Sequence, residues 1–439
     1  MQYPLGRYAS VQRLSGKGNH DLYLLLSDHP PFHPHRYTLM HTLIIPSRQL
    51  AAALLLSLIA ATSSAASAAD KQATERTPPL SASAVHKAPK AHTAQTLRSA
   101  SAAARARHKT QPHYAGDQEP EFTNFVQWKA VGEFINEMSD EHGFDRSELN
   151  AQFAKIHYLD KVIKLINPPP AGKAKNWTAY RERFVEPRRI QAGLDFWRRH
   201  ETELARAQAE FGVPPEIIVG ILGVETIYGR QPGNIRVMDA LTTLAFAYPE
   251  AANRQTRMEY FRNELKQVLL YARENHLDPF SLSGSFAGAI GLPQFMPGSI
   301  RRFAIDFDGD GKIDLRNSAA DAIGSVASFL TQHGWMANLP LVYPVRPETS
   351  SETLWKPLIG IALAATHSVD EIEQSGVVLP SEIPRSLMVG LVDLQDGERP
   401  TRYWVGSDNF FAITKYNRSY FYAMAVIELA NAIRQQRRS

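Results

Sequence analysis

The sequence predicts a mainly α-helical protein with a small β-containing insertion, and three observations support this. Beyond residue 120, apolar residues recur at helical spacing over most of the chain. Pro and Gly stand where those patterns begin and end. Between residues 340 and 407 the pattern changes to short β-compatible runs separated by turn residues. The 439 residues, 44% hydrophobic and 21% charged, have the composition of a globular protein with a sizeable core.

The N-terminal part reads as a secretory signal followed by a linker. Residues 50–61 form an apolar run that follows Arg48 and precedes Ala66-Ser67-Ala68, which is typical of a cleaved signal peptide and too short for a membrane span. We expect translation to start at Met40, residues 40–68 to be the signal, and residues 1–39 to be a mis-assigned extension. Residues 69–118 read as a disordered basic linker, because 76–116 hold seven Lys or Arg and no acid.

Charge and cysteine content exclude several classes of protein. There are 48 Lys+Arg against 44 Asp+Glu, a net charge of +4, which does not indicate a nucleic-acid partner. With no Cys, disulfides, thiolate metal sites, cysteine nucleophiles and a lipid anchor on cysteine are ruled out.

The basic linker at residues 69–118 has two interpretations. It is either a plain spacer or a segment that tethers the protein to an anionic surface.

The folded part divides into four segments: a helical domain (119–211), a core (212–339), a β-containing insertion (340–407) and a C-terminal helical part of the core (408–439). The expected helices are residues 147–166, 187–211, 215–229, 318–333 and 420–434, with further helical pattern up to Tyr271. Residues 387–394 and 403–405 read as strands around a turn at Asp396-Gly397.

An acid stands on the apolar face of the helix predicted at 215–229. Ile218, Ile221 and Leu222 precede Glu225 by seven, four and three residues, so all four share one face. Burial disfavours the charged form of a carboxyl group, and a carboxyl that stays protonated near neutral pH can act as a general acid. A structural Glu paired with Arg or a backbone amide is the equally weighted alternative.

Two further segments carry polar groups that a ligand would use. Residues 284–297 are rich in small residues, which allow close approach of a ligand or a second helix, and include Ser285 and Gln294. Residues 306–317 resemble an EF-hand loop, with Gly311 at its sixth position. The last position is Asn317 rather than Glu, so we expect a weak structural Ca²⁺ or Na⁺ site. The ligands predicted by this spacing are Asp306, Asp308, Asp310, the carbonyl of Lys312, and Asp314 through water.

Five segments together resemble the lytic murein transglycosylase B family, glycoside hydrolase family 103. They are GVPPEIIVGILGVET, GSFAGAIGLPQFMP, DFDGDGKIDL, DAIGSVASFL and ITKYNRSYFYAMAV, in this order between residues 176 and 433. The resemblance implies a lysozyme-like catalytic core. It also implies cleavage of the β-1,4 bond between N-acetylmuramic acid and N-acetylglucosamine in peptidoglycan, leaving 1,6-anhydromuramoyl ends.

The resemblance places Glu225 at the family's catalytic position. It would protonate the glycosidic oxygen, then take the proton of the sugar's 6-hydroxyl as that oxygen attacks C1. A single carboxylate then suffices, whereas ordinary glycosidases use two. Substrate contacts are implied for Ser285, Gln294, Tyr416, Asn417, Tyr422, Tyr180 and Arg257. The structural alternatives are an N-cap for Asn417, core packing for Tyr422, and a stacked ring and a solvated cation for Tyr180 and Arg257.

Two rival functions stay open on the sequence alone. One is a peptidoglycan-binding protein without catalysis, and the other is an ordinary lysozyme-type hydrolase. The partners expected are peptidoglycan glycan strands and other cell-wall enzymes, with no nucleic acid and no lipid anchor. The expected location is the periplasm, and no cofactor is required for the chemistry.

Overall fold

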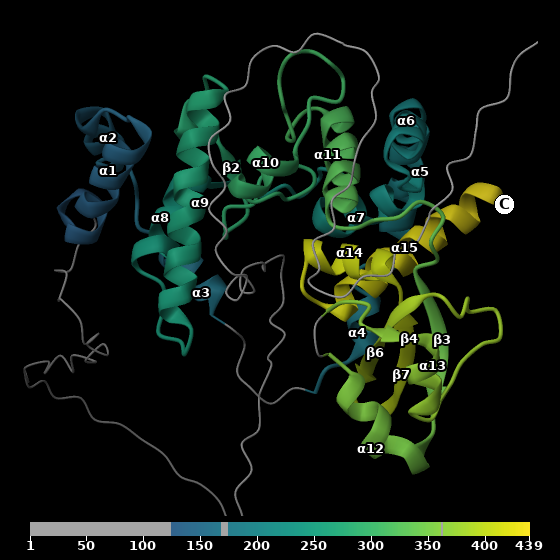
Figure 1. Cartoon of the computed structure of the whole chain (residues 1–439). Helices are drawn as coiled ribbons and strands as arrows, with labels where there is room; N and C mark the ends of the chain where they lie inside the picture. The colour runs from purple at the N-terminus through teal and green to yellow at the C-terminus, as the bar shows by residue number, and fades with distance from the viewer. Residues whose placement is uncertain (1–123, 168–173, 361–362) are drawn as a thin grey trace, which may run out of the picture. The chain divides into compact units, whose positions relative to one another are not determined.

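The computed structural model describes residues 124–167, 174–360 and 363–439. The expectations for the extension (1–39), the signal (40–68) and the linker (69–118) lie outside the described residues. Within the described part the chain is mostly helical, as the sequence predicts, with a five-stranded sheet and a pair of two-residue strands (Figure 1). No helix of this part is long and apolar enough to cross a membrane.

The N-terminal helices differ from the prediction at one point. The helix expected over 147–166 is two helices, α2 (Arg146–Phe153) and α3 (Asp160–Ile166). The break is held by contacts from α8 (Val237–Phe246): Asp239 accepts from His157 N at 3.1 Å, and Thr243 accepts from Leu159 N at 3.2 Å. The preceding elements are η1 (Phe125–Gln127) and α1 (Lys129–His142).

The long helix expected over 187–211 is likewise divided. Proline starts α5 (Pro187–Arg199), and α6 (Glu201–Phe211) follows after His200, whose φ of −121° and ψ of 34° leave the helical region. Gly212 ends α6 with a left-handed φ of 67°, as predicted. The short helix α4 (Trp177–Arg181) precedes this pair.

The helix that carries Glu225 is shorter than predicted. α7 (Pro215–Thr226) ends at Ile227, and Ile227 and Tyr228 adopt left-handed φ values of 51° and 56° before Gly229. Non-glycine residues rarely hold this conformation, so the surroundings must impose it. Thr226 helps to do so, because its Oγ1 accepts from Gly229 N at 2.9 Å and donates to Leu292 O at 2.8 Å.

The remaining helices agree with the pattern in the sequence. Ser318 caps the N-terminus of α11 (Ala319–Gln332), and Ser419 caps α15 (Tyr420–Arg438). The other elements outside the larger sheet are β1 (Ile235–Arg236), α9 (Arg254–Glu274), η2 (Pro279–Ser281), β2 (Ser283–Gly284), α10 (Pro297–Phe303) and α14 (Asp408–Tyr416).

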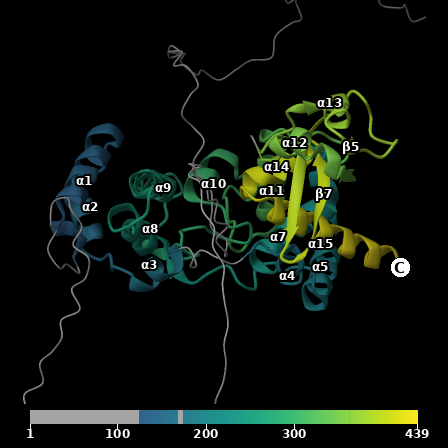
Figure 2. The same ribbon diagram turned by 90° about the horizontal axis from the view of Figure 1, so that it is seen from below.

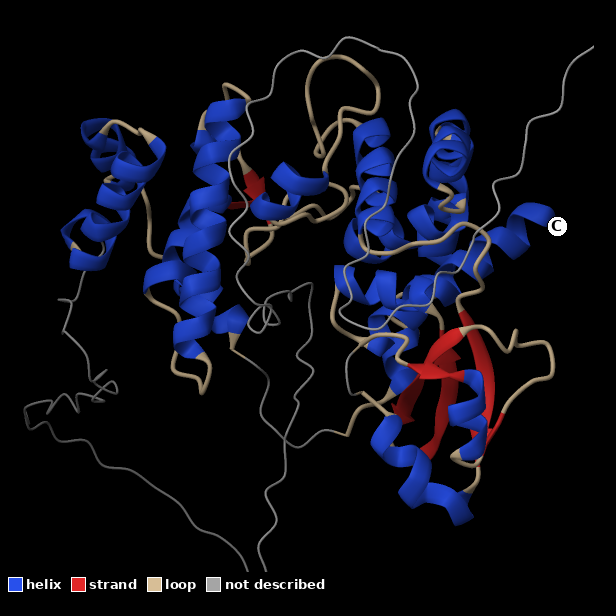
Figure 3. Cartoon of the chain, in the orientation of Figure 1, coloured by secondary structure: helices blue, strands red, loops and turns tan. Residues whose placement is uncertain are grey.

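The β-containing part is an antiparallel sheet of five strands in the order β4-β6-β7-β3-β5. The predicted strand and turn pairs are present as β6 (Met388–Asp396) and β7 (Arg399–Gly406), with Gly397 left-handed between them. A smaller apolar cluster around Trp355, Ile372 and Val405 lies under this sheet. Figure 3 shows its strands in red beside short helices. These elements are β3 (Val342–Pro347), η3 (Thr349–Ser351), α12 (Glu352–Trp355), η4 (Lys356–Leu358), β4 (His367–Ser368), α13 (Val369–Gln374) and β5 (Val377–Val378).

The centre of the helical core is the contact between α7 and α15, which lie side by side in both views (Figures 1 and 2). Glycine allows their close approach. A Cβ on Gly220 would lie 2.8 Å from the carbonyl oxygen of Val426, and one on Gly223 would lie 2.9 Å from Leu429. Glu225 of α7 and Tyr422 of α15 are therefore held by the same contact.

We predict that Gly220→Ala destabilises the fold, because the added methyl group overlaps backbone rather than a flexible side chain. Overpacking costs about 1–3 kcal/mol, which exceeds the ~1 kcal/mol that Ala gains over Gly in a helix. The matched control is Gly132→Ala on α1, where an added Cβ has no atom within 4 Å and should stabilise. Urea unfolding of both variants measures the difference, and equal stabilisation by both would contradict the close approach.

Candidate active site

Glu225 lies in the last turn of α7, partly buried. Its Oε1 accepts a hydrogen bond of 2.6 Å from the hydroxyl of Tyr422. Ser419 positions the donor, since it caps α15 and its Oγ accepts from Tyr422 N at 3.3 Å. Tyr422 is buried in the core, as the structural alternative expects, and its hydroxyl in addition bonds to the carboxyl group of Glu225.

The charge of this carboxyl group acts on three tyrosines, of which Tyr422 bonds to it directly. Burial raises the pKa of the Tyr416 and Tyr422 phenols well above the ordinary value, and the charge of Glu225 raises them further. Burial, and to a smaller extent the charge of Glu225, also raise the pKa of the Tyr180 phenol. All three stay neutral hydrogen-bond donors over the physiological range. Tyr180 comes from α4, and its phenol lies close enough to Glu225 to sense its charge.

Tyr416 links the carboxyl group to the segment of residues 284–297. Its ring lies parallel to that of Tyr422, with 6.3 Å between centroids, and its hydroxyl donates to the carbonyl oxygen of Pro293. Its ring also packs on Phe295 at 5.6 Å. Gln294 lies between these two contacts, and the site is therefore continuous from Glu225 to Gln294.

Gln294 is fixed by its own backbone and by its amide. It adopts a left-handed φ of 52°, and its Nε2 donates to Gly291 O at 2.9 Å and to Pro232 O at 3.1 Å. Both amide hydrogens are thus used within the protein, so the group it can offer a ligand is its Oε1 acceptor. Ser285 is complementary: its Oγ accepts from the backbone N–H of Ala289 at 3.0 Å, which leaves its hydroxyl hydrogen as a donor.

The structure shows the local contacts of Asn417 and Arg257. Asn417 is buried and ends α14, but the N-cap of α15 is Ser419, so the N-cap alternative for Asn417 is wrong. Arg257 on α9 is half-buried and contacts aromatic side chains. Its Nε donates to the Tyr248 hydroxyl at 3.3 Å, and its guanidinium lies 5.2 Å from the centre of the Phe261 ring. The predicted substrate contact of Arg257 stays a prediction.

The EF-hand-like loop brings three of the predicted ligands together. Carboxylate oxygens of Asp306, Asp308 and Asp310 all lie within 4.8 Å of one another. Gly311 has a φ of 87°, as a sharp turn at the sixth position requires.

The two later predicted ligands make contacts within the loop. Asp314 accepts from the backbone N–H of Asn317 at 2.9 Å and from Nδ2 of Asn317 at 2.9 Å. Lys312 N donates to Asp310 at 2.9 Å, within the same loop. Three clustered carboxylates fit a hard cation.

Glu264 is an acid near the site that the sequence did not single out. It is 3% exposed on α9 and accepts a 2.7 Å hydrogen bond from Gly298 N, in the first turn of α10. Burial raises its pKa to about 7, against the lowering effects of the Gly298 bond and of Arg302. It thereby holds the helix that directly follows the Gln294 segment.

Comparison with known proteins shows the family. The chain matches the model of the "Transglycosylase SLT domain" over residues 125–431. It is 39% identical over 309 residues to the membrane-bound lytic murein transglycosylase B of Escherichia coli strain K12, covering 69% of this chain and 81% of that protein. The chain belongs to the lytic murein transglycosylase family. Its relatives share the lysozyme-like, mainly helical fold that the sequence predicts.

Three solved structures extend this comparison. Soluble lytic transglycosylase SltB1 from Pseudomonas aeruginosa is 43% identical, with a TM-score of 0.64, covering 71% of this chain and 100% of that one. Escherichia coli Slt35 in complex with calcium is 38% identical, TM-score 0.62, covering 72% and 96%. SltB3 from Pseudomonas aeruginosa in complex with NAG-anhNAM-pentapeptide is 27% identical, TM-score 0.57, covering 70% and 79%.

We predict that Glu264 makes stability depend on pH. Its pKa of about 7 in the folded state exceeds the ordinary 4.5, so the folded state binds the proton more tightly. Its contribution is fully present below pH 4.5 and is lost as the pH rises through about 7. Each pKa unit is worth about 1.4 kcal/mol, so wild type should lose up to roughly 3 kcal/mol across this window. Glu264→Gln, whose Oε1 can still accept from Gly298, should flatten the dependence.

The measurement is thermal unfolding at pH 5 and pH 8, with the exposed Glu259→Gln on the same helix as the control. Contributions shared by the three proteins cancel in the comparison. Parallel pH curves for wild type and Glu264→Gln would disprove the assignment.

Proposed function

We propose that this chain cleaves the β-1,4 bond between N-acetylmuramic acid and N-acetylglucosamine in peptidoglycan and forms 1,6-anhydromuramoyl ends. The family relationship supports the activity. The observation that carries the residue assignment is the carboxyl group of Glu225, bound to the Tyr422 hydroxyl and bordered by tyrosine phenols. A single proton carrier of this kind suits a reaction in which the sugar provides its own nucleophile.

The proposed reaction has two proton transfers through one group. Glu225 gives its proton to the glycosidic oxygen as the C1–O bond breaks, and N-acetylglucosamine leaves. The resulting carboxylate takes the proton of the 6-hydroxyl as O6 bonds to C1, which closes the anhydro ring and restores the acid. Tyr422 holds Oε1 throughout, and neutral Tyr416 and Tyr180 provide dipoles beside the developing positive charge.

The polar groups of residues 284–297 are proposed to bind the glycan strand. Ser285 can donate to a sugar carbonyl or hydroxyl oxygen, and Gln294 can accept from a hydroxyl or an acetamido N–H. Asn417 is proposed to orient the acetamido group of the reacting sugar. The structure of a relative with an anhydro-sugar pentapeptide supports a cleft for such ligands in the family.

We predict that Glu225→Gln keeps the fold and lowers the rate by about 10²–10⁴-fold, the usual contribution of general acid–base catalysis. Glu216→Gln on the same helix is the matched control, since Glu216 pairs with Arg434 at 3.1 Å and should affect stability only. Mass spectrometry of muropeptides measures the products. Reducing ends from the wild type would instead indicate a lysozyme-type hydrolase, and an active Glu225→Gln would disprove the role.

The remaining proposals concern the ion and the location. Asp306, Asp308 and Asp310, with the Lys312 carbonyl and Asp314 through water, would hold Ca²⁺ or Na⁺, as the calcium complex of a relative supports. The ion would brace the loop between α10 and α11 without entering the reaction.

The sequence of residues 40–68 supports export to the periplasm through a cleaved signal peptide.

We predict that millimolar Ca²⁺ raises the melting temperature and leaves the rate of cleavage unchanged, because a ligand that binds the folded state stabilises it by mass action. Asp308→Ala should remove this shift, since it deletes one of the three clustered carboxylates. Differential scanning calorimetry with Ca²⁺, with chelator, and with NaCl at equal ionic strength separates binding from screening. The same shift in Asp308→Ala would place the ion elsewhere.

A further inference from the structure

Asp396 is a buried acid that the proposed reaction does not use. It is 2% exposed and lies at the end of β6, where the pairing of β6 with β7 shifts register. The sequence reads Asp396-Gly397 as an ordinary turn, in which an acid would be solvated. A carboxylate withdrawn from water needs strong partners to offset the loss of hydration.

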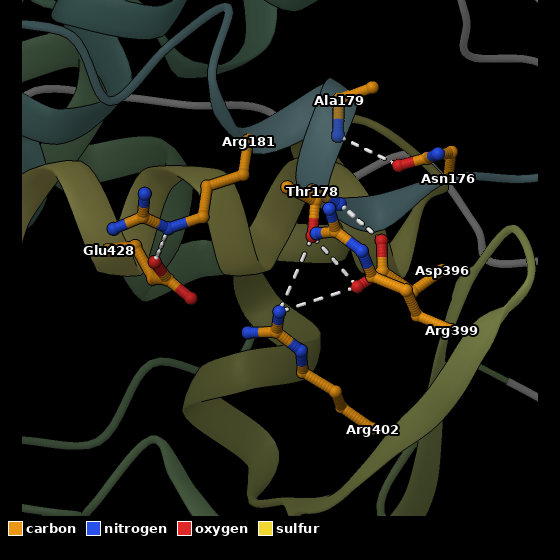
Figure 4. A network of polar contacts seen from close by, with 8 residues as sticks. All are labelled: Asn176, Thr178, Ala179, Arg181, Asp396, Arg399, Arg402 and Glu428. Atoms are coloured by element: carbon orange, nitrogen blue, oxygen red, sulfur yellow. Dashed lines mark hydrogen bonds and ion pairs between the residues drawn. The ribbon is translucent and has the colours of Figure 1, made fainter.

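Its partners come from α4, 218 positions earlier in the chain. Asp396 Oδ1 accepts from Thr178 N at 2.7 Å, and Oδ2 accepts from Thr178 Oγ1 at 2.8 Å (Figure 4). Two bonds to one residue fix both its backbone and its side-chain rotamer. The bond from Thr178 N lowers the pKa of Asp396, and Arg402 and Arg399 lower it further, so the group is charged.

Two arginines of β7 complete the network. Arg402 Nη2 lies 3.3 Å from Asp396 Oδ2, and Arg399 Nη1 donates to Thr178 Oγ1 at 3.1 Å. A backbone bond of 2.9 Å from Gly397 N to Lys175 O adds to the connection. The β6–β7 turn therefore binds the start of α4 through hydrogen bonds of both backbone and side chains.

α4 depends on these contacts with the β6–β7 turn, because a helix of five residues is not stable by itself. Its other side is fixed to α15. Arg181 forms an ion pair with Glu428, and Trp177 is fully buried against Phe421, with the ring centroids 5.5 Å apart (Figure 4 shows the ion pair). α4 is thus clamped between the sheet and the helix that carries Tyr422.

Tyr180 lies on the same short helix, and its phenol is close enough for the charge of Glu225 to raise its pKa. Its ring packs edge-on against Phe421 at 5.5 Å, and Phe421 is adjacent in sequence to Tyr422. Tyr180 is also stacked on Trp177 with 6.3 Å between centroids. A rotation of α4 would change the position of the Tyr180 phenol relative to the carboxyl group of Glu225.

We propose that Asp396 is a positioning residue, which acts through Thr178 and α4 to hold Tyr180 beside Glu225. The β-sheet part of the chain would then contribute to the reaction without contacting the substrate. This inference rests on the proposed function of Glu225. The competing explanation is that Asp396 only attaches the sheet to the helices, in which case its loss would lower stability and leave the rate per folded molecule unchanged.

The experiment measures kcat and KM of the full chain on soluble glycan strands for Asp396→Asn, Thr178→Val and Thr178→Ser. Asp396→Asn loses the charge, Thr178→Val loses only the hydroxyl, and Thr178→Ser keeps every polar contact. Glu398→Gln is the control, since Glu398 is exposed in the same turn. Each change is repeated in a Tyr180→Phe background, and melting temperatures confirm that the proteins are folded during the assay.

We expect Asp396→Asn and Thr178→Val to lower kcat about tenfold, as misplacement of a group at the reacting centre does. KM should change little in both variants. Thr178→Ser and Glu398→Gln should have kcat and KM near the wild-type values. In Tyr180→Phe the same changes should cost less than twofold. Unchanged kcat, or an equal loss in both backgrounds, overturns the proposal. If Asp396→Asn does not fold, Thr178→Val decides by the same criteria. The identity of the wild-type products tests the proposed function separately, since these comparisons use relative rates only.

Discussion

The close packing of α7 against α15 is the contact on which the site depends. Gly220 and Gly223 remove the side chains that would separate the two helices, and Val426, Leu429 and Ala430 of α15 fill the space. At this separation Tyr422, in the first turn of α15, reaches the carboxyl group in the last turn of α7. A larger residue at Gly220 would meet the backbone of α15, and one at Gly223 would meet Tyr228 as well as Leu429.

Tyrosine phenols are prominent in the surroundings of Glu225. The charge of Glu225 acts on Tyr180, Tyr416 and Tyr422, whose own ionisation is suppressed first of all by burial. Tyr422 therefore stays a neutral donor to Oε1 of Glu225. A fixed donor of this kind orients the carboxyl group, which a group that acts first as an acid and then as a base needs.

The sequence predicts the parts of the fold that local signals encode. Proline at the first position of α5 and α7 and Gly212 after α6 are short-range signals, and the structure has them as expected. The N-cap of α15 is Ser419 and not Asn417. The break at His200 and the early end of α7 have no Gly or Pro at the break. They depend on tertiary contacts, such as the ring of Tyr228 stacked on Phe196 at 5.3 Å. Periodicity within one segment cannot report such contacts.

The site residues divide in the same way into those that local signals predict and those that depend on tertiary contacts. Glu225 stands out because an acid on an apolar face is visible in a single helix, and the resemblance to a family pointed to Tyr416 and Tyr422. Glu264 and Asp396 were not found, because each occurs among charged or turn residues where an exposed acid is ordinary. Their burial follows from partners far along the chain, Gly298 for Glu264 and Thr178 for Asp396.

The long-range contacts also explain how a sheet can influence chemistry that occurs among helices. The hairpin of β6 and β7 ends at Asp396, and the helix it grips is one turn long, so the constraint passes from the hairpin to Tyr180 within a few residues. A longer helix would be held by its own hydrogen bonds and by more of the core, and would not need the sheet. Shortness makes α4 adjustable, and the buried carboxylate of Asp396 removes that freedom at the position where Tyr180 borders the acid.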